Sequence, residues 1–291
     1  MYDICCIGHI TLDRVVTPTM EKHMAGGTSF YFSNAIRKMD VNYGLVTALA
    51  ESEMNFVQDL RSNGTAVNVF PSAQTVYFEN IYSGKLDHRT QRVLQVADPF
   101  TVEQLSSINA RIFHLGPLLS NDISVELIVS LAERGRVSLD VQGYLREVRD
   151  QSVCAVDWPE KKQALQYVHT VKADEAELEV LTGVTGIAEG AKILSDWGVQ
   201  EIVITRASLG SVVYADNVFY EIPAFTPLAE VDATGCGDTY MAGYLYQRVK
   251  GAGIQKAGEF GAAMASLKME SYGPFDGTEE DILQLLAVNK S

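Results

Sequence analysis

Short apolar runs alternate along the chain with longer segments in which apolar residues recur every three or four positions. A short apolar run is typical of a buried β-strand, whereas the longer spacing predicts a helix with one buried face. Regular alternation of the two indicates a mostly parallel sheet with helices on both faces, so we predict a single domain, residues 1–291, built as a three-layer α/β/α sandwich. The expected strands are Ile4–Ile7, Tyr43–Ala48, Arg111–Leu115, Val137–Val141, Val168–Lys172 and Glu201–Thr205, and the expected helices are Ser29–Met39, Glu53–Asn63, Asp122–Arg134, Pro159–Gln166 and Gly186–Trp197, followed by Gly237–Val249, Ile254–Tyr272 and Thr278–Val288.

Residues 66–97 interrupt this alternation with polar, β-prone sequence. Strand-like runs at Thr75–Glu79 and Arg89–Val96 flank a turn at Ser83–Lys85, which predicts a hairpin or a small sheet. Two interpretations are open: an extension of the edge of the main sheet, or a separate lid beside a ligand cleft. We expect a lid formed by residues of about 11–20 and 66–97, whose exposed edge could pair with a second copy in a homodimer.

Composition narrows the classes of partner. Lys and Arg number 23 against 37 Asp and Glu, so the formal net charge of the 291 residues is −14. Because such a chain repels polyanions, we expect no nucleic-acid partner and no anionic membrane surface. The first eight residues lack the basic region of a signal peptide, no stretch reaches the roughly 18 apolar residues of a spanning helix, and the four cysteines show no Cys-x-x-Cys spacing. We therefore expect a cytoplasmic protein with reduced thiols. Because the overall charge is negative, any anionic ligand must be held by a local binding site.

The clearest candidate for such an anion-binding site is the segment Asp232–Gly243. Two glycines flank Cys236 just ahead of an expected helix, so the backbone can turn tightly and the amides of Gly235, Cys236 and Gly237 can form an anion-binding nest. The start of the helix adds positive potential. Asp238 is either a capping acid or, beside such a nest, a group that accepts the proton of a substrate hydroxyl.

This segment resembles the second signature of the PfkB, or ribokinase-like, family of carbohydrate kinases. The resemblance implies a ribokinase-like fold with a β lid, ATP as phosphate donor, magnesium, and often a monovalent cation such as K⁺. It assigns Asp238 the role of catalytic base and makes the amides of Gly235–Gly237 the anion hole over the transferred phosphate. Asp232 and Thr234 lie where the monovalent cation would bind.

Two earlier segments resemble the family's acceptor side. Gly8–Asp13 is similar to the opening strand, whose closing acid, here Asp13, binds substrate hydroxyls; a carboxylate can accept two such hydrogen bonds. Gly26 and Gly27 resemble the diglycine of the first signature, which lets the backbone approach the substrate. The lysine and asparagine that usually follow the pair are absent, so we expect substrate contacts unlike those of a ribose kinase.

Lys172–Glu177 resembles the family's Asn-x-x-Glu element, which organises magnesium and phosphate through water. Glu177 fits this pattern, Asp174 stands in place of the asparagine, and Lys172 becomes a candidate ATP-binding residue. Both acids supply oxygen to a hydrated cation, and the same pair would also serve as a capping pair at a helix start.

A second segment, Thr205–Gly210, resembles the loop that borders the nucleotide phosphates. The resemblance makes Thr205, Arg206 and Gly210 candidate ATP-binding residues, with Arg206 as the cation. An ordinary surface arginine is the alternative interpretation.

Asp140–Arg146 follows a predicted strand and resembles the Asp-x-Gln-Gly-x-x-Arg stretch of inositol-kinase-like family members. Gln142 and Arg146 are the candidate substrate ligands, and the resemblance implies a kinase that acts on a cyclitol or related polyol. Three alternatives stay open: a structural loop in which Arg146 pairs with an acid, a ribose or nucleoside kinase, and a catalytically silent relative that binds a sugar or nucleotide. The rings of Phe30, Tyr31 and Tyr144 would offer stacking partners to a nucleoside.

Overall fold

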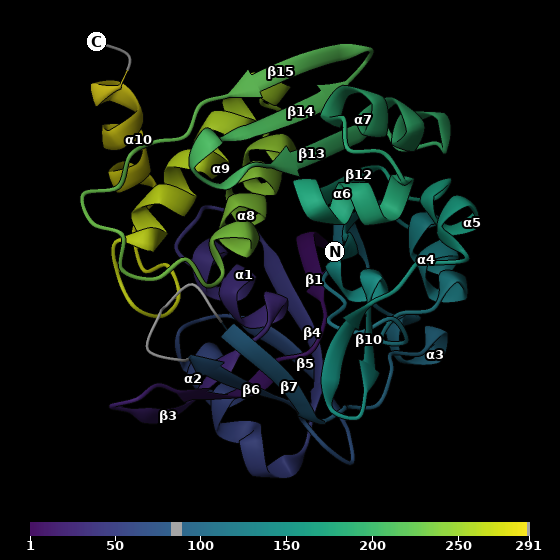
Figure 1. The fold of residues 1–291 in the computed structure, drawn as a ribbon, viewed down its shortest axis with the longest axis vertical. Coiled ribbons are helices and arrows are strands. Elements are labelled where there is room, and N and C mark those ends of the chain that lie inside the picture. The colour runs from purple at the N-terminus through teal and green to yellow at the C-terminus, as the bar shows by residue number, and fades with distance from the viewer. Residues whose placement is uncertain (83–88, 290–291) are drawn as a thin grey trace.

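The computed structural model describes residues 1–82 and 89–289 (Figure 1). Nine strands of this described part form the larger of two sheets. From β13 to β5 neighbouring strands pair in parallel, and β14 and β15 add an antiparallel hairpin at one edge. In order across the sheet the strands are β15 (Val218–Ile222), β14 (Ser211–Ala215), β13 (Glu201–Thr205), β12 (Thr170–Asp174), β9 (Arg136–Asp140), β8 (Ala110–Leu115), β1 (Tyr2–Ile7), β4 (Tyr43–Leu49) and β5 (Ala66–Pro71).

Helices cover both faces of this sheet, which confirms the predicted sandwich. Successive side chains of a strand point to opposite faces, so Cys5 and Ile7 pack into one core and Ile4 and Cys6 into the other. The first face packs against α3 (Val102–Leu105), α4 (Val125–Ala132), α5 (Lys161–Leu165), α6 (Glu175–Thr182) and α7 (Ile187–Asp196), and the second against α1 (Thr28–Ile36), α2 (Met54–Ser62), α8 (Cys236–Val249), α9 (Ile254–Met269) and α10 (Glu279–Val288). Short 3-10 helices lie at Glu51–Glu53, Val141–Leu145 and Ala207–Leu209.

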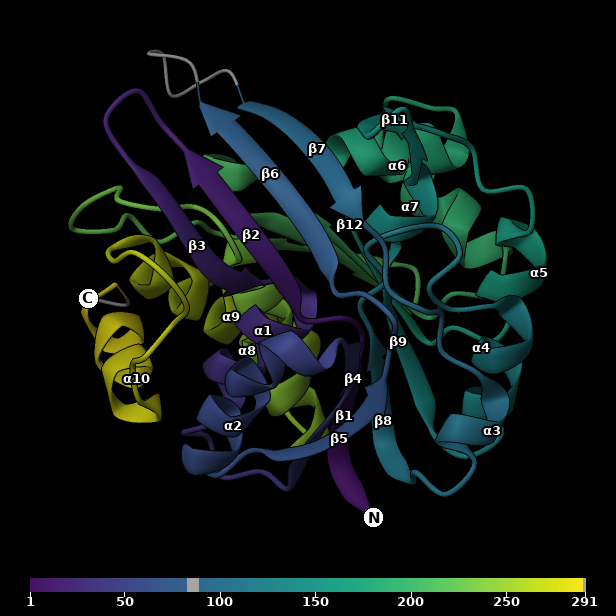
Figure 2. The same cartoon turned by 90° about the horizontal axis from the view of Figure 1, so that it is seen from below.

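A second sheet stands apart from the larger one, and Figure 2 shows four of its strands, β3, β2, β6 and β7, side by side. It has a small apolar core of its own, in which Phe78 and Val93 pack with Leu118 and Leu119 from the segment after β8. In order across the sheet its strands are β10 (Arg146–Arg149), β11 (Ser152–Ala155), β7 (Arg89–Gln95), β6 (Val76–Tyr82), β2 (Thr11–Val16) and β3 (Glu21–Gly26).

The bounds expected for the lid need correction. Residues 66–71 form β5, which pairs in parallel with β4 and so extends the larger sheet. The strands β3, β10 and β11 belong to the second sheet, although the sequence pattern did not indicate them. The expected turn at Ser83–Lys85 lies outside the described residues.

Parallel pairing brings the polar candidates to one edge of the larger sheet. The strands β1, β9, β12 and β13 end at Ile7, Asp140, Asp174 and Thr205, and ligands of open α/β sheets bind outside such carboxyl ends. None of the helices within the described ranges is long and apolar enough to cross a membrane.

Candidate active site

The glycine-rich segment ahead of α8 forms a tight turn against α1. Gly235 has φ 78°, a left-handed conformation that glycine adopts without strain, and a Cβ at this position would overlap the ring of Tyr31. The amide of Cys236 donates to the carbonyl oxygen of Ala233 (3.2 Å), whereas no described residue accepts the amide of Gly235 or Gly237. The two glycine amides are therefore free to hold an anion at the positive end of α8.

Asp238 lies in the first turn of α8, directly behind these amides. Burial raises the pKa of its carboxyl to about 7, and the negative charge of Asp140 adds to the rise. The ammonium group of Lys172 and a hydrogen bond with Thr28 act in the opposite direction. A carboxyl with a pKa of about 7 exchanges a proton readily near neutral pH.

Lys172 places a buried ammonium group beneath the same turn. Its Nζ lies 3.0 Å from Oδ2 of Asp140 and 3.7 Å from Oε2 of Glu177. A Cβ built on Gly237 would lie 3.5 Å from Nζ. Burial alone would lower the pKa of Lys172, but the two carboxylates raise it, so the group stays charged. A fixed positive charge therefore lies close to one of the free amides.

Asp174 and Glu177 form a reciprocal capping box at the start of α6. Oδ1 of Asp174 accepts the amide of Glu177 (2.7 Å), and Oε2 of Glu177 accepts the amide of Asp174 (2.9 Å). Burial raises the pKa of Glu177, although Lys172 counteracts this. Among the residues described, no group of three or more His, Cys, Asp or Glu side chains could hold a metal ion directly. Any metal contact of these two acids would therefore run through water.

Asp13 and the diglycine meet on the second sheet. Oδ1 of Asp13 accepts a hydrogen bond from the hydroxyl of Thr11 (2.6 Å), and a Cβ on Gly26 would lie 2.5 Å from Oδ2 of Asp13. Only glycine at position 26 leaves room for the carboxylate. Gly27 has φ 85° and precedes α1, and a Cβ there would lie 2.7 Å from the carbonyl oxygen of His9.

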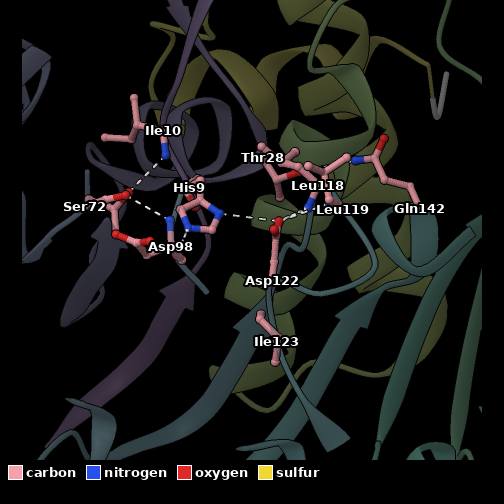
Figure 3. Close-up of polar contacts among 12 residues, drawn as sticks. His9, Ile10, Thr28, Ser72, Asp98, Leu118, Leu119, Asp122, Ile123 and Gln142 are labelled. Atoms are coloured by element: carbon pink, nitrogen blue, oxygen red, sulfur yellow. Dashed lines mark hydrogen bonds and ion pairs between the residues drawn. The ribbon is translucent and has the colours of Figure 1, made fainter. Parts of the chain in front are cut away.

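A buried histidine supports the segment between the two sheets (Figure 3). His9 Nε2 lies 3.0 Å from the carbonyl oxygen of Asp98, and Nδ1 lies 3.4 Å from Oδ2 of Asp122. The same oxygen of Asp122 accepts the amide of Leu118 (2.7 Å), and a Cβ on Gly27 would lie 3.4 Å from Cδ1 of Leu118. His9 is therefore structural and fixes the backbone that faces the diglycine.

Gln142 and Arg146 lie on the loop that follows β9. Asp140 accepts the amide of Gln142 (3.1 Å), and Nε2 of Gln142 lies 3.4 Å from the hydroxyl of Thr28. Figure 3 shows the side chains of Gln142 and Thr28 near each other. Since Thr28 also bonds Asp238, the amide of Gln142 is connected to the candidate base. Arg146 is half-buried at the start of β10, and its guanidinium group makes no ion pair or hydrogen bond with a described residue. Its guanidinium group is thus available to a ligand.

Thr205, Arg206 and Gly210 occupy the connection between β13 and β14. Nη2 of Arg206 lies 2.8 Å from Oε2 of Glu221, so this cation already has a partner. Gly210 has φ 85°, which glycine alone adopts readily. Glu221 partly neutralises Arg206, as Asp140 partly neutralises Lys172. Lys172 nevertheless has the stronger geometric support as a phosphate-binding cation, because it lies beside Gly237.

Comparison with models of known families adds the deciding observation: residues 81–281 match the model described as pfkB family carbohydrate kinase. The chain belongs to this family. It follows that this PfkB-family protein is a phosphotransferase with a hydroxyl acceptor, as the resemblance of Asp232–Gly243 predicted.

Several named proteins and solved structures resemble this PfkB-family chain along nearly its whole length. A cytidine kinase of Thermococcus kodakarensis is 25% identical over 289 residues, which cover 96% of this chain and 100% of that protein. A solved pyrophosphate-dependent kinase in the ribokinase family, complexed with a pyrophosphate analog and myo-inositol, superposes with a TM-score of 0.87 at 31% identity and covers 97% of this chain and 99% of its own. Arabidopsis thaliana ribokinase, complexed with ribose and ATP, shares the fold with a TM-score of 0.80 at 19% identity over 98% of each chain.

The monovalent cation expected at Asp232 and Thr234 is not supported in this PfkB-family structure. Nζ of Lys268 lies 3.1 Å from Oδ2 of Asp232 and donates to its carbonyl oxygen at 2.6 Å. The amide of Thr234 donates to Oδ1 of Asp232 (2.9 Å). A side-chain ammonium group therefore already contacts two oxygens of Asp232, one of the two residues expected to hold K⁺.

Sequence reasoning missed Lys268 and Thr28. Lys268 is one lysine in a helical segment, and only the packing of α9 against the loop before α8 brings it to Asp232. Thr28 follows the diglycine directly, where the sequence pattern shows only that the family's usual lysine and asparagine are absent. The available signal was a hydroxyl residue directly after the diglycine, at the start of an expected helix.

Proposed function

We propose that this PfkB-family kinase transfers the terminal phosphoryl group of ATP to a hydroxyl of a cyclitol or a related polyol, with Asp238 as the base. The observation that carries the proposal is the position of Asp238 behind the free amides of Gly235 and Gly237, with a pKa raised to about 7. A carboxylate with such a pKa can accept the hydroxyl proton while the amides hold the phosphate.

The reaction is an in-line displacement. The acceptor oxygen attacks the terminal phosphorus, the bond from phosphorus to the leaving diphosphate oxygen breaks, and the hydroxyl proton moves to Asp238. The amides of Gly235 and Gly237, the start of α8 and the ammonium group of Lys172 stabilise the negative charge of the transferred group. Positioning and electrostatics supply most of the catalysis in this chemistry.

Magnesium would be held through water by Asp174 and Glu177. Their capping bonds use Oδ1 of Asp174 and Oε2 of Glu177, and the other oxygen of each carboxylate can accept hydrogen bonds from metal-bound water. When bound, the ion neutralises charge on the donor phosphates. Because an acid stands here in place of the family's asparagine, the site favours a cation more strongly than the family pattern does.

Three side chains support a polyol as acceptor. Asp13 offers a carboxylate, Gln142 an amide and Arg146 a free guanidinium group, and together they can accept and donate hydrogen bonds to several hydroxyls. The structural neighbour complexed with myo-inositol supports the same choice. The second sheet would act as a lid that excludes water and so limits hydrolysis of the donor.

Two specific observations favour variants of this function. The neighbour at 31% identity is pyrophosphate-dependent, so pyrophosphate is a second candidate donor, and Lys172 suits its charge as well as that of ATP. The cytidine kinase relative aligns along nearly the whole chain, so a nucleoside is a second candidate acceptor; the ring of Tyr31, however, is buried against Gly235.

The test is a matrix of acceptors and donors with Mg²⁺ present. Cyclitols, pentoses, hexoses and nucleosides are each assayed with ATP or pyrophosphate, and the phosphorylated product is measured; the Asp238→Asn variant supplies the background. Product with ATP and a cyclitol supports the proposal. Product only with a nucleoside or a pentose would replace the acceptor, and product only with pyrophosphate would replace the donor. No product from a folded protein across the matrix would contradict the proposal.

A further inference from the structure

Lys268 brings a buried positive charge to the loop ahead of α8. It lies one residue before the end of α9, and its side chain is fully buried. Its Nζ contacts both a carboxylate oxygen and the main-chain carbonyl oxygen of Asp232, at 3.1 and 2.6 Å. A single ammonium group is thus held by two oxygens of one residue, away from solvent.

Asp232 ties this charge to the start of α8. Its Oδ1 accepts the amide of Thr234 (2.9 Å), its Oδ2 also accepts the amide of Gly273 (3.3 Å), and its own amide donates to the carbonyl oxygen of Met269 (3.2 Å). Burial would raise the pKa of Asp232, but the hydrogen bond from Thr234 and the charge of Lys268 bring it below its usual value. The residue is therefore an ionised partner that joins the loop to the end of α9.

The pair also acts on the candidate anion hole. Oδ1 of Asp232 accepts the amide of Thr234, which directly precedes Gly235, and Sγ of Cys236 lies 3.6 Å from the carbonyl oxygen of Ala265, three residues before Lys268 on α9. Both charges therefore lie close to the turn that carries the free amides of Gly235 and Gly237. Without Lys268, the carboxylate of Asp232 would repel a phosphate group at those amides.

We propose that Lys268 supplies the monovalent positive charge of this site from within the chain, so that the anion hole works without bound K⁺ or any other monovalent cation. Lys268 is a positioning residue: it neutralises Asp232 and fixes the loop, and it touches neither donor nor acceptor. The part of this inference that concerns catalysis rests on the proposed function of Gly235–Gly237.

The first test measures stability and needs no enzyme activity. Thermal melts of the wild type and of Lys268→Met are recorded in KCl, NH₄Cl, NaCl and tetramethylammonium chloride at equal ionic strength. We expect the same Tm for the wild type in all four salts. Lys268→Met should melt several degrees lower in tetramethylammonium chloride and recover in KCl or NH₄Cl, because a cation that binds only the folded state stabilises it by mass action.

The second test repeats the salt series with turnover as the readout. The wild-type kcat should not change with the cation, whereas Lys268→Met should lose about 10²-fold in kcat, comparable to the loss of one oxyanion-hole donor. K⁺ or NH₄⁺ should restore part of the loss with little change in the acceptor KM. A loss of packing alone would show no such selectivity for the cation.

Arg248→Met is the matched control. Arg248 lies near the other end of α8, far from the anion hole. Like Lys268, it pairs with a carboxylate, that of Glu201, and donates to a main-chain carbonyl oxygen, that of Ala252 (2.5 Å). Its removal should lower the Tm equally in KCl and NaCl. Equal rescue of this variant by K⁺ would mark the effect as nonspecific and overturn the proposal.

Three further outcomes would overturn it. One is a wild type whose Tm is higher, or whose kcat is several-fold higher, in KCl than in NaCl. This measurement uses the wild type alone, so it remains valid if Lys268→Met does not fold. Another is a folded Lys268→Met that keeps full kcat without K⁺, and the third is a folded variant that neither K⁺ nor NH₄⁺ restores. If the wild type transfers phosphate to nothing, the proposed function fails, while the melts still decide whether Lys268 replaces a cation.

Discussion

Asp238 must satisfy two opposing requirements. As a base it has to be ionised, yet its burial in the first turn of α8 and the nearby charge of Asp140 favour the protonated form. Lys172 and the hydrogen bond with Thr28 counteract them, and the resulting pKa of about 7 lies close to a working pH. Near pH 7 the carboxyl group of Asp238 can therefore both accept and release a proton.

Asp238→Asn should lower kcat by at least ~10²-fold, because a positioned base usually contributes ~10²–10⁴-fold. The amides of Gly235 and Gly237 remain, so binding of the donor should change little. The measurement is turnover together with donor affinity by calorimetry. Asp281→Asn is the matched control, since Asp281 occupies the same third position of α10. Asp238→Asn turnover above about 1% of wild type would remove Asp238 from the role of base.

The pH profile should report the same group. We expect kcat/KM to fall below pH 7 with the slope of a single proton, since protonated Asp238 cannot accept the hydroxyl proton. Lys172→Met removes a charge that lowers this pKa, so the residual activity should show the acid limb at higher pH. Lys250→Met, which breaks an exposed ion pair with Asp40, should leave the limb in place. An unmoved limb in Lys172→Met would contradict the assignment.

Stability should vary with pH in the opposite sense to activity. The folded-state pKa of about 7 exceeds the unfolded value of about 3.9, so between these values the folded chain keeps a proton that the unfolded chain has lost. The free energy of unfolding therefore falls as pH rises through this window and stays reduced above pH 7. Asp238→Asn should raise stability at pH 8 by on the order of 2 kcal/mol, with a smaller gain near pH 5. Thermal melts of the wild type and of Asp238→Asn at pH 5 and pH 8 test this prediction. An equal gain in stability at the two pH values would contradict it.

At the scale of elements, the acceptor side depends on a close contact between two strands. Met24 of β3 pairs with Asp13 of β2, and two residues further on Gly26 leaves space for the Asp13 carboxylate. The strand pairing therefore sets where the candidate hydroxyl ligand lies.

Gly26→Ala should raise the acceptor KM by about tenfold, because the new Cβ would meet Oδ2 of Asp13 at 2.5 Å and displace one hydrogen-bonding group, worth about 1.4 kcal/mol. The donor KM should stay the same, since the donor groups lie on the larger sheet and α8. Gly253→Ala, which meets nothing within 4 Å, is the control. Steady-state kinetics for both substrates would show an unchanged acceptor KM if Asp13 has no role in acceptor binding.

What the sequence could predict depends on whether a contact is local or joins segments that are far apart in the chain. The turn at Gly235–Gly237 and the capping box of Asp174 and Glu177 are local, so residue type and spacing were sufficient. The membership of β5, the neutralisation of Arg206 and the approach of Lys268 to Asp232 depend on contacts between segments far apart in the chain. No local pattern encodes such contacts, so only the folded structure reveals them.

At the scale of the whole molecule, the second sheet has an exposed edge. Strand β3 lies at the end of its strand order, and Glu21, Lys22 and His23 are exposed. An unpaired edge offers its amides and carbonyls to another strand, which a second copy can supply across a two-fold axis. We propose that the edge of β3 is the site of the expected homodimer.

Sedimentation equilibrium should show a dimer of the wild-type chain. Successive residues of a strand direct their amides to opposite sides, so one of Lys22→Pro and His23→Pro removes an outward-facing amide and should yield monomer. The other variant should instead weaken the pairing of β3 with β2. A monomeric wild type would contradict the proposal.

The separation of the two sheets has a consequence for how such kinases diversify. The candidate base Asp238 and the candidate donor groups Lys172 and Asp174 belong to the larger sheet and its helices, whereas Asp13 and Arg146, two of the three candidate acceptor ligands, belong to the second sheet. Exchanges within the second sheet can therefore change the alcohol without disturbing the phosphate chemistry. Evolution can therefore change the acceptor while the phosphoryl-transfer reaction is kept. Exchange of the second sheet for that of a relative is accordingly a starting point for redesigning the acceptor specificity of this enzyme.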